Sequence, residues 1–205
     1  MPVARTPVTI LTSDTSGQEG YKLLTGLVVP RPIGWIGTVA LDGTANLAPY
    51  SFFNAVTGDP PTVLFSAGGT SRKDSATNAR ETGEFTVNIV SRHLAEAMNA
   101  TAATVAADVD EFEHAGLTAV PGVVVKAPRV AEARAQLECV VTDVVHVGRP
   151  EGGSWIVIGE VVVFHVDPDL LDGTRVDQVG LAAVGRHAGN WYSNATDLFE
   201  MVRPP

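Results

Sequence analysis

Apolar and polar residues alternate with a period of two along several stretches of the chain, a pattern typical of β-strands. Residues 84–90 alternate large apolar side chains with Thr86 and Asn88 and predict a half-buried strand. Residues 135–147 and 155–166 form longer apolar runs separated by a Gly-rich turn. We therefore expect these two long segments to pair as a hairpin.

A second hairpin is predicted near the start of the chain. The apolar run 35–40 is followed by Asp42 and Gly43, a dipeptide suited to a tight turn, and residues 44–48 form the returning strand. Because proline has no N–H to donate to a sheet ladder, we expect the chain to leave the sheet at Pro49.

Helices are expected at few places. Residues 71–81 predict a short helix, and Gly83 stands where a C-terminal cap would lie. The Ala-rich segment 91–107 predicts a helix that frays towards its end. The acidic segment 108–122 is expected to be a loop with one helical turn, and residues 123–125 are expected to pair at a sheet edge.

Strands, including a further one at 62–66, outnumber helices, and strand–helix–strand alternation is not regular. This pattern favours a mainly β fold with α additions: an antiparallel barrel with a few peripheral helices. Residues 1–20 lack sustained periodicity and predict an N-terminal arm, followed by a helical turn at 21–24. The segment 21–205 has the length of one ordinary domain.

Composition and charge narrow the function classes. The net charge is −9, and no run of Lys and Arg offsets it, so we expect no nucleic-acid binding. Apolar stretches such as 161–166 are far shorter than the ~20 residues that span a bilayer, so we expect no membrane contact. Without an apolar signal core at the N-terminus, the composition predicts an acidic, soluble cytoplasmic protein. Cys139 is the single cysteine, which excludes an internal disulfide.

Common catalytic and nucleotide motifs are absent from the sequence. There is no Gly-x-Gly-x-x-Gly after a strand, no Gly-x-x-x-x-Gly-Lys and no Gly-x-Ser-x-Gly. The five histidines show no metal-ligand spacing, so no metal site is expected. His187 differs from the others because Arg186, Trp191 and Tyr192 surround it in a Gly-flanked loop. It is either a catalytic residue near a cofactor or substrate, or a plain loop residue.

Two segments carry candidate chemistry. Residues 50–54 combine aromatic rings, a hydroxyl and an amide, which suits a flat, partly polar ligand; a buried hairpin end accounts for the same residues. The start of the helix at 71–81 combines Arg72 and Lys73 with two hydroxyls, which suits a phosphate, whereas a solvated helix start is the alternative. Together the two segments suggest a phosphorylated aromatic cofactor.

Several segments, in this order, resemble the flavin reductase-like, FMN-binding split-barrel family. They are Arg31-Pro32-Ile33-Gly34-Trp35-Ile36, Asn46-Leu47-Ala48-Pro49-Tyr50-Ser51-Phe52-Phe53, Asp59-Pro60-Pro61, Arg72-Lys73-Asp74-Ser75-Ala76-Thr77-Asn78, Glu84-Phe85-Thr86-Val87-Asn88, Gly185 to Tyr192 and Phe199 to Pro204. The resemblance spans about residues 21–204. It departs from the family pattern at Ser75, where Thr is frequent, and at His187-Ala188-Gly189, where a Gly pair is frequent.

The resemblance implies a Greek-key split barrel, a two-fold homodimer and FMN near the interface. The residues implied for the phosphate and ribityl chain are Ser71, Arg72, Lys73, Ser75 and Asn78. Those implied for the border of the isoalloxazine ring are Asn46, Ala48, Pro49, Tyr50, Ser51 and Phe52. Trp35 would pack near the ring or ribityl chain, and Asn88 is a further candidate.

The function implied is an NAD(P)H-dependent flavin reductase that passes hydride from NADH or NADPH to FMN. The reduced flavin would be used in place or handed to a partner monooxygenase. An electron-transfer flavoprotein with a protein partner is one alternative. A non-catalytic FMN-binding protein is another.

Overall fold

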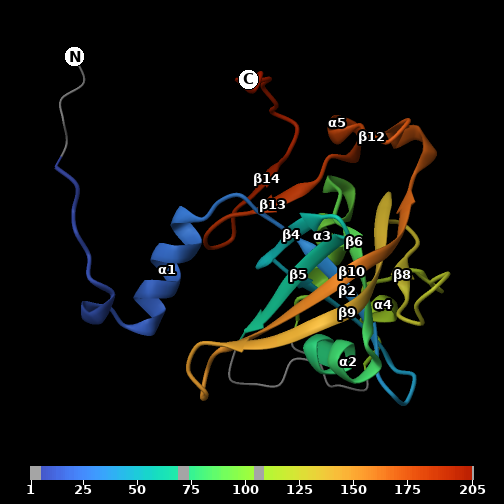
Figure 1. The fold of residues 1–205 in the computed structure, drawn as a ribbon, viewed down its shortest axis with the longest axis horizontal. Helices are drawn as coiled ribbons and strands as arrows, with labels where there is room; N and C mark the ends of the chain where they lie inside the picture. Colours follow the sequence, from blue (N-terminus) through green and yellow to red (C-terminus); the bar gives the residue numbers. More distant parts are fainter. Residues whose placement is uncertain (1–5, 69–73, 104–108, 205) are drawn as a thin grey trace.

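The computed structural model describes residues 6–68, 74–103 and 109–204. Its main feature is a seven-stranded sheet in the order β3-β2-β6-β9-β10-β5-β4, with every neighbouring pair antiparallel (Figure 1). The strands are β2 Gly34–Val39, β3 Ala45–Tyr50, β4 Phe53–Gly58, β5 Pro61–Gly68, β6 Glu84–Ile89, β9 Ala135–Val147 and β10 Ser154–Val166. The mainly β, antiparallel fold expected from the alternation is confirmed.

Smaller sheets and helices surround the main sheet. A three-stranded sheet has the order β1-β13-β14, and two short pairs join β7 to β8 and β11 to β12. Their bounds are β1 Arg31–Pro32, β7 Ala119–Val120, β8 Arg129–Val130, β11 Leu171–Asp172, β12 Arg175–Val176, β13 Val184–Arg186 and β14 Tyr192–Asn194. The helices are α1 Gly17–Leu27, α2 Asp74–Thr82, α3 Ala95–Ala100, α4 Glu111–His114 and α5 Gln178–Leu181, with 3-10 turns η1 Thr12–Asp14, η2 Arg92–Leu94 and η3 Pro168–Leu170.

The two long strands pair as expected. β9 and β10 form an antiparallel hairpin, and β10 also pairs with β5. A register shift falls at Gly159, where a Cβ atom would come within 2.5 Å of the Phe85 ring. Glycine at this position therefore leaves room for the Phe85 ring of β6, which reaches across β9 to β10.

The chain does not leave the sheet at Pro49, contrary to the expectation. Pro49 lies inside β3, opposite Trp35, and β3 is an edge strand. The N–H of Leu47 points away from β2, because it donates to the Glu111 carboxylate. Two residues on, Pro49 has the same orientation, so its missing N–H removes no ladder bond.

Strand β6 is buried on both faces rather than half-buried. Phe85 and Val87 belong to one apolar core with α2, as the alternation predicts. On the opposite face, the Thr86 hydroxyl donates to the Pro128 carbonyl, and the Asn88 amide bonds the Trp35 carbonyl and the Val130 N–H. These polar residues are covered by the segment that precedes β9, which satisfies their hydrogen bonds.

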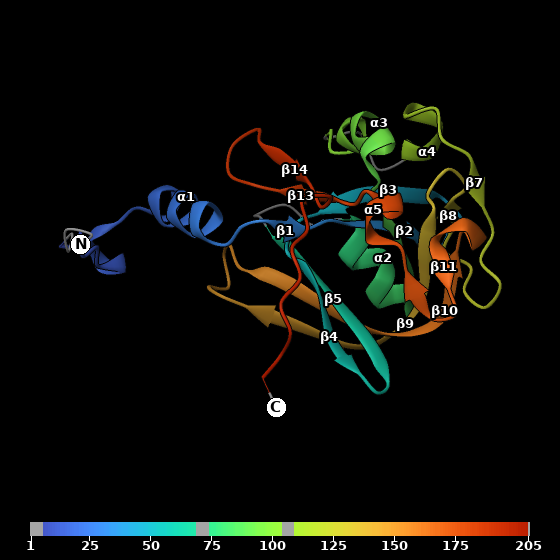
Figure 2. The ribbon, with the colours of Figure 1, turned by 90° about the horizontal axis from the view of Figure 1, so that it is seen from above.

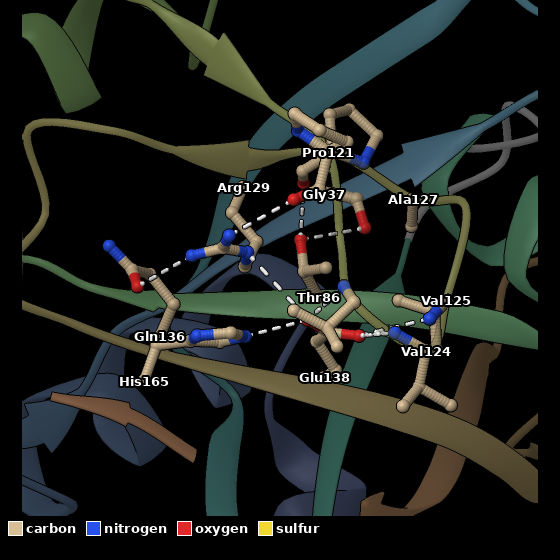
Figure 3. A network of polar contacts seen from close by, with 12 residues as sticks. Gly37, Thr86, Pro121, Val124, Val125, Ala127, Arg129, Gln136, Glu138 and His165 are labelled. Atoms are coloured by element: carbon tan, nitrogen blue, oxygen red, sulfur yellow. Dashed lines mark hydrogen bonds and ion pairs between the residues drawn. The ribbon is translucent and has the colours of Figure 1, made fainter. Parts of the chain in front are cut away.

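The segment covering β6 is held by a buried carboxylate (Figure 3). Residues 123–125 were expected to pair at a sheet edge, but all three donate their backbone N–H groups to Glu138 on β9. The His165 ring lies 2.6 Å from the same carboxylate. A side chain therefore replaces the predicted strand pairing at this point.

The helices differ from the expectation mainly at the N-terminus. Ser16 and Glu19 form a capping box, so α1 begins at Gly17 and is much longer than the expected turn at 21–24. Figures 1 and 2 both show α1 set apart from the main sheet. At the predicted cap, Gly83 has a φ of +77° and ends α2 by donating to the Ala79 carbonyl. Among the described residues, no helix is long and apolar enough to cross a membrane.

Candidate functional site

Strand β3 presents candidate residues on two opposite faces. Side chains alternate along a strand, so Asn46, Ala48 and Tyr50 point one way. This face lies against α2, because Asn46 bonds Ser75 of that helix. Pro49 and Ser51 point the other way, towards α3 and the C-terminal segment, where both line a cleft. The residues predicted from the sequence to border the flavin ring therefore fall into two groups, one on each face of β3.

A buried polar network occupies the α2 face. The Ser75 hydroxyl donates to the Asn46 carbonyl oxygen over 2.7 Å, and the Asn46 amide donates to Glu111 over 2.8 Å. The Thr38 hydroxyl donates to Asn46 over 3.3 Å and accepts from the Asn78 amide over 3.2 Å. These bonds fix the first described turn of α2 and the short helix α4 against β3.

Two titratable groups on this face have raised pKa values. Burial raises the pKa of Tyr50 to about 12, although hydrogen bonding to Ser75 lowers it in part, so the hydroxyl is neutral at physiological pH. Burial also raises the pKa of Glu111, and it outweighs the hydrogen bonds from Leu47 and Asn46, which lower that pKa. The network thus contains neutral donors and one carboxyl that resists ionisation.

Several predicted cofactor residues therefore lie close together but are buried. Asn46, Ser75 and Asn78 are 8%, 1% and 7% exposed, and they bond to residues of the network. Trp35 has no exposed surface, and its indole N–H donates to Thr101. In this conformation these side chains support the site rather than line it, so their direct contact with a cofactor stays a prediction. Ser71, Arg72 and Lys73 lie outside the described residues.

The other face of β3 borders a cleft of about 390 Å³, within the range of small-molecule sites. Its walls come from α1, β1, the end of β3, α3 and the β13–β14 hairpin. They are Tyr21, Thr25, Arg31, Ile33, Pro49, Ser51, Met98, Asn99, Ala102, Arg186, His187, Ala188, Gly189 and Tyr192. Pro49, Ser51 and His187 were all singled out from the sequence, and the structure brings them together here.

His187 is held in the β13–β14 turn. Its Nε2 lies 2.9 Å from the Ser193 hydroxyl, and its backbone N–H donates to the Trp191 carbonyl. The backbone carbonyl of His187 accepts from Arg31 over 3.1 Å. The ring is therefore fixed beside the cleft, where it can exchange a hydrogen bond with a ligand; its catalytic role stays a prediction.

Two cationic side chains also line the cleft. Arg31 donates to the carbonyls of Thr25 and Val28 at the C-terminal end of α1, and its guanidinium lies 5.9 Å from the centre of the Phe52 ring. Arg186 lies 4.5 Å from the centre of the Tyr192 ring. Arg186, Tyr192 and Asn99 also line an adjoining hollow of about 660 Å³, which extends the cleft along α3.

Arg31 and Glu111 were not assigned to the site from the sequence. Arg31 stands between two prolines in a quoted motif, but only the fold brings its guanidinium under His187. Glu111 lies in an acidic loop that gave no signal for contact with β3. Among the described residues, no group of His, Cys, Asp and Glu is placed to hold a metal ion.

Comparison with known proteins identifies the family. The flavin reductase like domain model matches residues 25–182, most of the chain. The chain belongs to the flavin reductase like family. The protein is accordingly a flavin-related oxidoreductase.

Several solved structures are closely similar to this chain. Nitrilotriacetate monooxygenase component B from Bacillus cereus is 35% identical, with a TM-score of 0.94 over 97% of this chain and 100% of that one. The 2-nitrobenzoate 2-nitroreductase from Pseudomonas fluorescens is 29% identical, with a TM-score of 0.88 and 96% of each chain covered. A Shewanella frigidimarina protein with a split barrel domain is 23% identical, with a TM-score of 0.83 over 94% of this chain and 96% of that one. The fold is therefore that of the split-barrel flavin reductases.

Proposed function

We propose that this protein binds FMN and reduces it with NADH or NADPH. The observation that carries the proposal is the cleft beside β3, where Pro49, Ser51 and His187 meet in a chain of the flavin reductase like family. FMN, when bound, supplies a ring that accepts hydride from a nicotinamide. The protein's task is then to bind and orient both molecules and to limit the access of water.

The residues around the cleft fit a flavin ring. Ile33, Pro49 and Met98 provide apolar surface, and Ser51 adds a neutral hydroxyl that can hydrogen-bond a ring edge. Behind this wall, the bonds from Asn46 to Ser75 and Glu111 keep β3 in place. Ser71, Arg72 and Lys73 are proposed to bind the phosphate, as their side chains suit that group.

The reduced flavin is proposed to serve a partner monooxygenase. The Bacillus cereus structure, named as a monooxygenase component B, supports this direction of electron flow. Electron transfer to another protein is the alternative for the same site, and non-catalytic FMN binding is the alternative from a different class.

A homodimer is part of the proposal. Helix α1 stands apart from the main sheet (Figure 2). Apolar side chains on it such as Leu24 and Leu27 are 52% and 80% exposed. Phe199 and Val202 in the C-terminal segment are similarly exposed, at 84% and 87%. Burying such surface against a second copy would be favourable. Light scattering after size-exclusion chromatography would test the mass, and a monomer would reject this part.

The function is tested by anaerobic absorbance spectroscopy of the purified protein after FMN is added. Bleaching of the flavin by NADH or NADPH is expected, and the faster nucleotide identifies the donor. Bleaching by dithionite alone would contradict the reductase and favour electron transfer or storage. Failure to bind FMN would reject the proposal as a whole.

A further inference from the structure

One buried charge beside the cleft lacks a counter-charge. The side chain of Arg31 is 6% exposed, and no carboxylate of the described residues pairs with it. Arginine stays protonated at any physiological pH. A buried, unpaired charge is costly in free energy, so an Arg kept in this position calls for a reason.

The hydrogen bonds of Arg31 leave two of its five N–H donors without a partner among the described residues. Nη1 donates to the carbonyls of Thr25 and Val28, and Nη2 donates to the carbonyl of His187. Nε is buried and has no partner. Of the five N–H donors of an arginine, the Nε donor and one Nη2 donor are therefore unpaired. Such a pair matches the two oxygens of a carboxylate or phosphate.

The surroundings of Arg31 favour an anion. The residues that line the cleft include Arg186 and His187 but no Asp or Glu. Arg186 is held by the Tyr192 ring and the Gly189 carbonyl, without a carboxylate among the described residues. A cleft with two arginines and no acid is notable in a chain whose net charge is −9. The charged side chains of the cleft itself are therefore cationic, whereas the adjoining hollow adds one acid, Glu96, and one further cation, Arg92.

We propose that this cleft binds an oxyanion, a carboxylate or a phosphate, through the unpaired N–H donors of Arg31, with Arg186 as a second cation. In the proposed reductase the oxyanion belongs to the molecule that exchanges electrons with the flavin, so this assignment rests on the proposed function. The oxyanion has two sources: the diphosphate of a nicotinamide dinucleotide, or the carboxylate of an organic acceptor. Binding of the anion itself does not require flavin reduction.

The test is calorimetric titration of the full-length protein, with and without added FMN. Benzoate is the carboxylate probe, pyrophosphate is the phosphate probe, and benzamide is the neutral analogue of benzoate. We expect at least one anion to bind in a salt-dependent manner, and benzamide to bind at least tenfold more weakly than benzoate if benzoate is the ligand. Tighter pyrophosphate binding would assign the cleft to the dinucleotide, and tighter benzoate binding would assign it to an acceptor.

Variants locate the binding site. Asn99 is an exposed residue that lines the cleft, so Asn99→Glu adds a negative charge there and leaves the bonds of Arg31 unchanged. Anion binding is expected to weaken at least tenfold. Gln178→Glu adds the same charge at the start of α5, outside both hollows, and should bind like the wild type. Arg31→Lys keeps the charge but loses the two-donor edge, and an intermediate affinity is expected.

The proposal is overturned by any of three results: neither anion binds, benzamide binds as well as benzoate without any pyrophosphate binding, or Asn99→Glu binds like Gln178→Glu. These results do not depend on the reductase assay. A protein that binds anions but is not bleached by nucleotide would keep the anion cleft and reject the reductase.

Discussion

Glu138 and Arg31 are both buried charged residues, but they differ in how completely they are partnered. Glu138 has no exposed surface and accepts three backbone N–H bonds from Val123, Val124 and Val125, besides its contact with His165 (Figure 3). Burial alone would raise its pKa, but these hydrogen bonds lower the pKa of Glu138 to about 2. Arg31 makes three hydrogen bonds to carbonyls and leaves Nε without a partner.

This difference distinguishes a buried charge that is compensated within the fold from one that can bind an external ligand. Arg129 shows that an unbonded Nε is not enough, because its Nε also lacks a hydrogen bond but lies 3.7 Å from the Glu138 carboxylate. Its charge is therefore compensated within the fold. Arg31 combines an unbonded Nε, no carboxylate partner among the described residues and a position in the cleft wall. Only this combination points to an external anion.

The largest effect is expected for Glu138→Gln. A glutamine amide offers one acceptor oxygen and turns an NH₂ group towards donors, so several N–H groups lose their partner. We expect a loss of about 3 kcal/mol or more in the free energy of unfolding, measured by urea denaturation. Glu151→Ala in the exposed β9–β10 turn is the control and should change it by less than about 0.5 kcal/mol. A loss for Glu138→Gln as small as that of the control would mean that the network does not stabilise the fold.

The contribution of Glu138 to stability should also depend on pH. Because the pKa of Glu138 is lowered from 4.5 to about 2, its contribution is fully present above pH 4.5 and is lost as the pH falls towards 2. The contribution of this group amounts to about 3 kcal/mol. Urea denaturation at pH 7, 4 and 3 should show a difference in the free energy of unfolding between wild type and Glu138→Gln. This gap is expected to shrink at the lowest pH. An unchanged gap would show that Glu138 is not held ionised in the folded state.

A smaller loss is expected for Arg31→Met. Three hydrogen bonds to the end of α1 and to His187 disappear, but so does an unpaired buried charge, and these effects oppose each other. We expect the free energy of unfolding to fall by about 1–2 kcal/mol. An anion that binds the folded protein at a hundredfold excess over its Kd stabilises it by about 2.7 kcal/mol. Thermal unfolding with the anion should show this gain in the wild type and not in Arg31→Met. A gain of equal size in both would place the anion elsewhere.

Much of the fold could be predicted from local pattern. β9 has the predicted bounds, and the tight turn predicted at Asp42 and Gly43 is present, with a φ of 94° at Gly43. The errors lie where tertiary contacts replace local rules. Pro49 stays in the sheet because β3 is an edge, and residues 123–125 bond a carboxylate instead of a strand. Neither fact is visible before the strand order and the position of Glu138 are known.

The candidate site was predicted only in part, for a similar reason. A contiguous list of residues around Pro49 ignores the alternation of side chains, which divides the list between a buried network and a cleft. Arg31 was quoted as part of a motif, but its missing partner is a property of the folded chain. Sequence similarity therefore locates the right strand, whereas geometry decides which side chains a ligand can reach.

The smallest loss of stability, and one that changes with pH in the opposite direction, is expected for Glu111→Gln. Burial is the main cause that raises the pKa of Glu111, and the nearby Asp110 adds to it. A raised folded-state pKa gives stability that is present below pH 4.5 and is lost as the pH rises through the folded value. A glutamine cannot ionise, but it loses one of the two acceptor oxygens that serve Asn46 and Leu47.

The variant should therefore be less stable than the wild type at pH 4, with a gap that narrows by pH 7 because only the wild type is penalised by ionisation. Glu113→Gln, exposed on the same helix, is the matched control and should show no such trend. The gap for Glu138→Gln widens with pH over the same range, so one set of urea denaturation curves tests both pH trends. A gap for Glu111→Gln that widens with pH would mean that the buried carboxylate is stabilised by its bonds to β3, and the network would then resemble the one around Glu138.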